Sequence, residues 1–203
     1  SAAEEHAKVL GKTHELLTSD QMAAFKVRSE PREMLEKYGD NNFGRGCLMA
    51  RRLVEVGVPF IEVNSGGWDL HQNCFTSLET KLPELDKAFA ALVEDLQQRG
   101  LLESTVVLCM GEFGRTPRVN GEAGRDHFAR AWSVVLGGAA IQGGRAIGKT
   151  SSDGTSVETD PFTSEDLMAT VCQALGISLQ TTYTAKNGRP MKIAGGGRVI
   201  QDL

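Results

Sequence analysis

The segment from Thr76 to Gly100 constrains the fold most, because it is the clearest helix in the sequence. Thr76 and Glu79 have the spacing of a capping box at its start, and Gly100 ends it. The apolar run Ser104–Met110 follows, with no alternation of polar residues, as is typical of a strand covered on both faces in a parallel sheet. The apolar side chains of the helix recur every three or four residues: Leu78, Leu82, Leu85, Phe89, Leu92 and Leu96.

Helical patterns and short apolar runs alternate along the rest of the chain. Helical patterns cover residues 1–17, 30–38, 43–57 and 163–176, and apolar runs cover residues 58–63, 131–138 and 146–148. This alternation predicts an α/β fold, with a largely parallel sheet flanked by helices. We expect one domain over residues 1–203, with a helical segment at 1–40 and an irregular tail or small hairpin at 177–203.

Composition excludes several classes of protein. The sequence is 40% hydrophobic and 24% charged, as in an ordinary globular domain. Its net charge of -4 argues against a nucleic-acid binder, which needs concentrated Lys and Arg. No apolar stretch is long enough to predict a membrane span. The four cysteines are far apart, so they predict no metal or redox motif; Cys74, near His71, leaves a thiol function as a weak alternative.

Charged side chains follow two of the apolar runs. Ligands of open α/β sheets bind beyond the carboxyl ends of the strands, so these positions are candidates for a site. Asp69 and His71 come after residues 58–63, and their spacing of two places both side chains on one side of an extended segment. Glu112 follows the run Ser104–Met110 directly, and the motif GRDH at residues 124–127 comes soon after it.

Carboxylates and imidazoles together are ligands that Zn²⁺, Mn²⁺ or Fe accept readily. Arg115 and Arg125 carry guanidinium groups that can hold a phosphate or sulfate group in a forked geometry. Metal ligands beside guanidinium groups suit the hydrolysis of a phosphate or sulfate ester. The same residues also fit a second interpretation, in which Asp–His hydrogen bonds and Arg–Glu ion pairs only fasten loops. Asn73 fits either a ligand contact or a backbone contact.

Several motifs resemble one bacterial family. The motifs are FGRGCLMARRLVEVGVPFIEV, GGWDLHQN, GEFGRTP, GRDHFARAWSVVLGG and the terminal GRPMKIAGGGRVIQDL. They resemble the domain of unknown function 1501 within the alkaline-phosphatase-like superfamily, and the likeness extends from about Thr18 to the last residue. The resemblance implies an alkaline-phosphatase-like sheet with a divalent metal, Zn, Mn, Ca or Mg, at the strand ends. It also implies export to the periplasm.

The resemblance also implies roles for individual residues. Metal ligands would be Asp69, His71, Glu112 and His127. Asp126 would orient His127 or bind the metal directly, and Asn73 would lie behind the ligands. Arg115 and Arg125 would bind the oxyanion. The motif GEFG is similar to an Asp-His-Gly motif of the superfamily, but Phe113 stands where that motif has its histidine.

Family members begin with an export signal and an early strand that carries the candidate nucleophile, and no such segment is found here. We therefore expect a C-terminal portion that lacks the first strands and has little activity alone. The sheet edge or apolar face left exposed would favour either a homodimer or instability. The leading hypothesis is a metal-dependent hydrolase of small phosphate or sulfate esters. The alternative is a non-catalytic binding or scaffolding module of the same superfamily.

Overall fold

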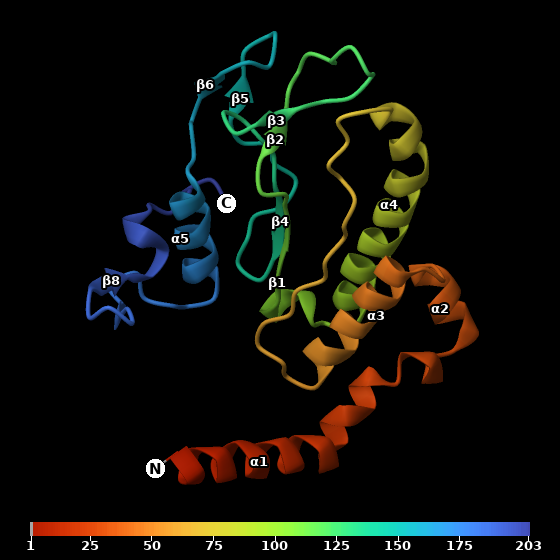
Figure 1. The fold of residues 1–203 in the computed structure, drawn as a ribbon, viewed down its shortest axis with the longest axis vertical. Helices are drawn as coiled ribbons and strands as arrows, with labels where there is room; N and C mark the ends of the chain where they lie inside the picture. The colour runs from red at the N-terminus through yellow and green to blue at the C-terminus, as the bar shows by residue number, and fades with distance from the viewer. Residues whose placement is uncertain (1) are drawn as a thin grey trace. The chain divides into compact units, whose positions relative to one another are not determined.

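Helices make up most of the first hundred residues. The computed structural model describes residues 2–203, which Figure 1 traces from red to blue. These residues form two compact units. Unit 1 contains the residues up to Trp68 together with Leu78–Leu101, and unit 2 contains Asp69–Ser77 together with Leu102–Leu203.

The helices of unit 1 begin and end near the residues that the sequence predicted. Asn41 caps α3 through its side chain, which accepts a hydrogen bond from the backbone N–H of Gly44 at 2.8 Å. The long helix α4 begins two residues before the predicted Thr76, at Cys74, so the expected capping pair lies inside it. The helices are α1 (Ala2–Thr18), the 3₁₀ helices η1 (Asp20–Phe25) and η2 (Val27–Ser29), α2 (Arg32–Tyr38), α3 (Asn42–Glu55) and α4 (Cys74–Gln98).

The core of unit 1 joins an apolar cluster to a buried ionic network. Apolar residues of η2, α2, α3 and α4 pack together, among them Val27, Cys47, Leu48, Ala88 and Ala91. Beside them the guanidinium of Arg51, only 2% exposed, forms ion pairs with three carboxylates. The partners of Arg51 are Glu30 at 3.0 Å, Glu55 at 2.6 Å and Asp95 at 3.0 Å.

The strands of unit 2 are short, and all four pairs that the structure describes are antiparallel. The longest pair joins β1 (Val106–Cys109) to β4 (Val135–Gly138), which lie side by side in Figure 1. The others are β2 (Gly114–Arg115) with β3 (His127–Phe128), β5 (Lys149–Thr150) with β6 (Val157–Thr159), and β7 (Thr182–Thr184) with β8 (Pro190–Lys192).

The predicted parallel sheet is therefore wrong, and so is the alkaline-phosphatase-like layering built on it. Residues 58–63, predicted to form a buried strand, belong to no helix or strand. Residues 146–148 also lie outside any strand, and β5 begins directly after them at Lys149. The strands at 106–109 and 135–138 exist, but they pair with each other in opposite directions. An apolar run shows that a strand is covered, and it does not record the direction of its neighbour.

The end of unit 2 folds around helix α5 (Ser164–Ala174). The capping box predicted from Thr163 and Asp166 is confirmed, since each side chain bonds to the backbone N–H of the other. The 3₁₀ helices η3 (Leu102–Ser104) and η4 (Ile193–Gly196) and the β7–β8 hairpin complete this unit. Across the described residues, no helix is both long and apolar enough to cross a membrane.

Candidate metal centre

Backbone hydrogen bonds hold the segment around His71 against the loop that joins β2 to β3. The N–H of Arg125 donates to the carbonyl of Leu70 at 3.0 Å, and the N–H of Asn73 donates to the carbonyl of Glu122 at 3.0 Å. Gly124 lies so close that a Cβ atom there would overlap the carbonyl of His71. A glycine is therefore needed where the two segments meet.

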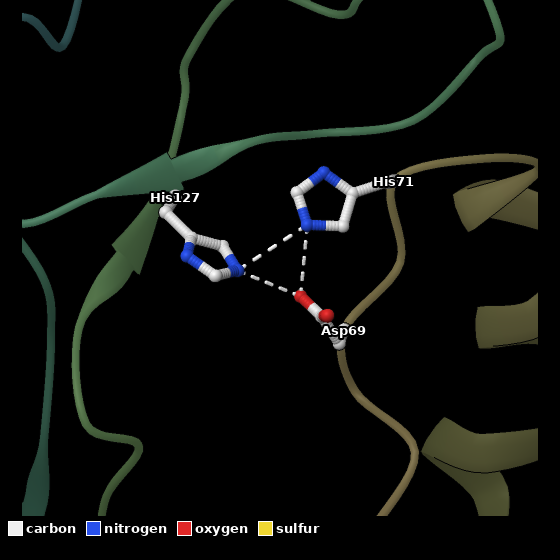
Figure 2. A group of neighbouring side chains, drawn as sticks. All are labelled: Asp69, His71 and His127. Carbon is white, nitrogen blue, oxygen red and sulfur yellow. Dashed lines mark hydrogen bonds and ion pairs between the residues drawn. The ribbon is translucent and has the colours of Figure 1, made fainter.

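This contact brings together three side chains from two distant segments, residues 69–71 and His127. Figure 2 shows the rings of His71 and His127 turned toward the carboxylate of Asp69. The oxygen Oδ1 of Asp69 lies 2.8 Å from Nε2 of His127 and 3.0 Å from Nε2 of His71. The two Nε2 atoms are 3.2 Å apart. One carboxylate oxygen and two imidazole nitrogens thus lie within 4.8 Å of one another, all at the surface of unit 2.

Asp126 fixes the orientation of His71. Its Oδ1 lies 2.8 Å from Nδ1 of His71, and this hydrogen bond is the largest cause that lowers the pKa of the Asp126 carboxyl. An ionised carboxylate only accepts hydrogen bonds, so Nδ1 of His71 must donate. With Nδ1 engaged by Asp126, Nε2 is the ring nitrogen that faces Asp69 and His127. A carboxylate behind a histidine is the usual support of a metal-binding imidazole.

Asn120 is a supporting residue that the sequence reasoning missed. Its side-chain NH₂ donates to the carbonyl of His71 at 3.0 Å and to Oδ1 of Asp126 at 3.2 Å. Its side-chain oxygen accepts from the backbone N–H groups of Glu122 and Gly124, both at 3.0 Å. One amide therefore ties together the loop, the carboxylate and the His71 segment. The turn-forming sequence Asn120-Gly121 was the available signal.

Asp69 is also paired with Arg115. The guanidinium nitrogen Nη2 of Arg115 lies 2.8 Å from Oδ1 of Asp69. The hydrogen bond to His127 and then the one to Arg115 lower the pKa of Asp69 to about 2. Asp69 is therefore ionised at neutral pH, as a metal ligand must be.

Three other residues predicted to belong to the site, Arg125, Glu112 and Asn73, are not part of the cluster of Asp69, His71 and His127. Arg125 uses its Nη1 to bind the carbonyls of Thr116 at 2.7 Å and Pro117 at 2.8 Å, so it braces the loop. Glu112 is exposed and is not among the clustered ligands. Asn73 is exposed in a left-handed conformation (φ 47°) just before α4, where its backbone carbonyl accepts from the N–H of Ser77.

Phe113, which stands where the superfamily motif has a histidine, packs against the ring of His127. The two ring centroids are 4.4 Å apart, with the planes inclined at 43°. Phe113 thus supports one ligand candidate from the side. The thiol of Cys74, considered as a weak alternative, is free and buried.

The donor set fits a divalent metal ion. Asp69, His71 and His127 match the carboxylate and imidazole ligands of three-residue zinc sites, which leave a fourth position for a small ligand. The exposure of the three side chains leaves that fourth position accessible. Asp126 and Asn120 supply the supporting hydrogen bonds that such sites need.

Residues 1–203 match a family described as protein of unknown function (DUF1501), and the chain belongs to that family. No curated protein and no solved structure matches the sequence. The family description names no activity, so function must be argued from the site.

Proposed function

We propose that this protein is a metal-dependent hydrolase of phosphate or sulfate esters, related to the alkaline-phosphatase-like superfamily. The observation that carries the proposal is the convergence of Asp69, His71 and His127, with Arg115 2.8 Å from Asp69. The superfamily relation rests on the motifs around these residues, and the proposal that the protein is exported rests on the same resemblance.

The residues of the site have separate roles in binding the metal and the substrate. Asp69, His71 and His127 would hold the metal, and Asp126 keeps Nε2 of His71 turned toward it. A divalent cation there would polarise the ester and offset the charge that develops on its oxygens. Arg115, on the same side of the hairpin, would hold a non-bridging oxygen through its guanidinium N–H groups.

The first test measures metal binding. We expect residues 1–203 to bind one Zn²⁺ or Mn²⁺ ion in competition with a coloured chelator. Asp69→Asn and His127→Ala should abolish this binding, because each removes one of three ligands. His6→Ala removes an exposed histidine of α1 and is the matched control.

The second test measures turnover. The metal-loaded, full-length product of the gene should hydrolyse a generic aryl phosphate or aryl sulfate, and Asp69→Asn should remove that activity. If the full-length protein binds metal and hydrolyses neither ester, the hydrolase proposal is wrong.

The second candidate is a binding or scaffolding module. One observation favours it: Oδ1 of Asp69 already accepts hydrogen bonds from Arg115 and from His127, so the loops can be joined without an ion. This candidate predicts that Zn²⁺ binds no more tightly to the natural protein than to Asp69→Asn. Metal titration therefore separates the two functions.

A further inference from the structure

A single carboxylate oxygen of the site has three nitrogen neighbours. Oδ1 of Asp69 lies 2.8 Å from Nη2 of Arg115, 2.8 Å from Nε2 of His127 and 3.0 Å from Nε2 of His71. The two histidine nitrogens can become ligands of a metal beside Asp69. The guanidinium cannot, because it has no lone pair to offer. A metal ion held by the two Nε2 atoms would approach the same Asp69 oxygen that Arg115 occupies, so the two cations compete there.

The hairpin delivers Arg115 to the same place as one of the ligands. Arg115 of β2 is the register partner of His127 of β3. Directly opposed residues of an antiparallel pair project their side chains from the same face. The guanidinium is thus held close to any ion that His127 binds, and two positive charges at that distance repel each other.

The other contacts of Arg115 are weak, so it can be displaced. Its Nη1 lies 3.4 Å from the carbonyl of Arg125, at the limit of a hydrogen bond. Its guanidinium carbon lies 5.6 Å from the centroid of the Phe113 ring, a cation–π contact that contributes little at a partly exposed site. The side chain is 26% exposed, so it can turn toward solvent.

We propose that Arg115 is an exchangeable cation, which pairs with Asp69 in the metal-free protein and is released by the metal to bind the oxyanion of the substrate. This inference rests on the proposed function and specifies how the metal and the substrate bind to its site. Metal binding has to break the Asp69–Arg115 pair, whereas an oxyanion gives the freed guanidinium a new partner. The metal and the anion therefore strengthen each other's binding, by the same factor in both directions.

The test compares Zn²⁺ affinities of three variants, with and without inorganic phosphate at concentrations that keep zinc soluble. Arg115→Gln removes the competing cation, so it should bind Zn²⁺ about fivefold or more tightly than the natural protein, the lower end of usual coupling. Phosphate should then raise the Zn²⁺ affinity of the natural protein by a larger factor than that of Arg115→Gln. Arg115→Lys keeps a cation able to pair with Asp69, so its affinity for Zn²⁺ should remain near that of the natural protein.

Arg118→Gln is the matched control. It removes the same charge from an exposed side chain of the loop that follows β2, and its affinity for Zn²⁺ should change little. If Arg118→Gln gains as much affinity as Arg115→Gln, the effect is one of net charge and the exchange is refuted. Circular dichroism of each variant confirms that it is folded.

The possible failures are distinguishable. If the natural protein binds Zn²⁺ and hydrolyses esters but Arg115→Gln binds Zn²⁺ no more tightly, the exchange is wrong and the proposed function stands. If phosphate raises the Zn²⁺ affinity of both proteins equally, the exchange is also wrong. If neither protein binds Zn²⁺, the metal site itself is refuted, and the exchange with it.

Discussion

Single residues of the site were partly predictable from the sequence. Asp69, His71 and His127 stood out because each histidine lies beside a carboxylate in a glycine-rich segment after an apolar run, and the structure brings these three together. The place of Asp126 behind His71, rather than behind His127, depends on how the hairpin loop closes. Asn120 could not be assigned, because its four hydrogen bonds exist only once the loop is folded.

Asp126 gives a prediction at the scale of one residue. Asp126→Asn removes the negative charge that holds the N–H of His71, so we expect metal affinity to fall about 10- to 100-fold, as for other supporting residues of metal sites. Competition with a coloured chelator measures the loss. Asp153→Asn, in an exposed loop of the same unit, is the control and should bind metal like the natural protein. An unchanged affinity in Asp126→Asn would mean that His71 needs no support.

At the scale of elements, helices were recognised and strand pairing was not. The period of three to four residues records which face of a helix is buried, and this was enough to find α3, α4 and α5. A run such as Val106–Cys109 contains no information about its neighbour. Its partner, Val135–Gly138, is also apolar, and either direction of pairing is compatible with the two runs.

The buried ionic network connects the helices of unit 1 and gives a second prediction. Arg51→Ala removes the cation that Asp95, Glu55 and Glu30 share, although Arg52 still pairs with Glu30 and Arg99 still pairs with Asp95 and Glu55. Unfolding in urea should therefore show a loss larger than that of an exposed ion pair but below the roughly 3 to 5 kcal/mol expected when a buried charge is left unpaired. Arg32→Ala is the control, because its ion pair with Glu36 is exposed and should contribute less than about 1 kcal/mol. Equal losses in both variants would show that the network is not effectively buried.

Asp166 connects α5 to the C-terminal segment and gives a prediction about pH. Its carboxylate accepts from the backbone N–H of Arg198 at 2.7 Å and from that of Thr163 at 3.0 Å. These bonds, that from Arg198 first, lower the pKa of Asp166 below its ordinary value of 3.8. The folded protein therefore binds this proton more weakly than the unfolded chain does. The resulting stability is present above pH 3.8 and is lost as the pH falls through the lower, folded value.

The measurement compares the free energy of unfolding of the natural protein with that of Asp166→Asn over a range of pH. The difference should be largest near neutral pH and should narrow as acid protonates Asp166. Asp160→Asn, outside α5 and exposed, should show no such narrowing. A difference that stays constant down to strongly acidic pH would contradict the assignment.

At the scale of the whole molecule, the chain divides into two units, and all candidate ligands belong to unit 2. No feature of the sequence marks the boundary at Ser77, because it falls inside the continuous helix α4. Such a boundary is defined by which residues touch, and that becomes known only with the fold.

The division predicts where a metal stabilises the protein. The sequence has two tryptophans, Trp68 in unit 1 and Trp132 in unit 2. Trp132→Phe therefore leaves fluorescence that reports on unit 1, and Trp68→Phe leaves fluorescence that reports on unit 2. Zinc at 100 times its dissociation constant should stabilise the unit that binds it by about 2.7 kcal/mol. The transition seen by Trp132 should therefore move to higher denaturant, and that seen by Trp68 should move less. Equal movement of both would mean that the units unfold as one.

The close approach of Gly124 to the carbonyl of His71 offers a way to sort other members of the family. Any larger residue at this position would force the two segments apart and separate the ligands, even if all three were retained. A relative with the acid and both histidines but no glycine here would keep all three ligand residues, but they would lie too far apart to bind one metal ion. Such a natural chain would be the most informative comparison for anyone choosing which homologues to purify.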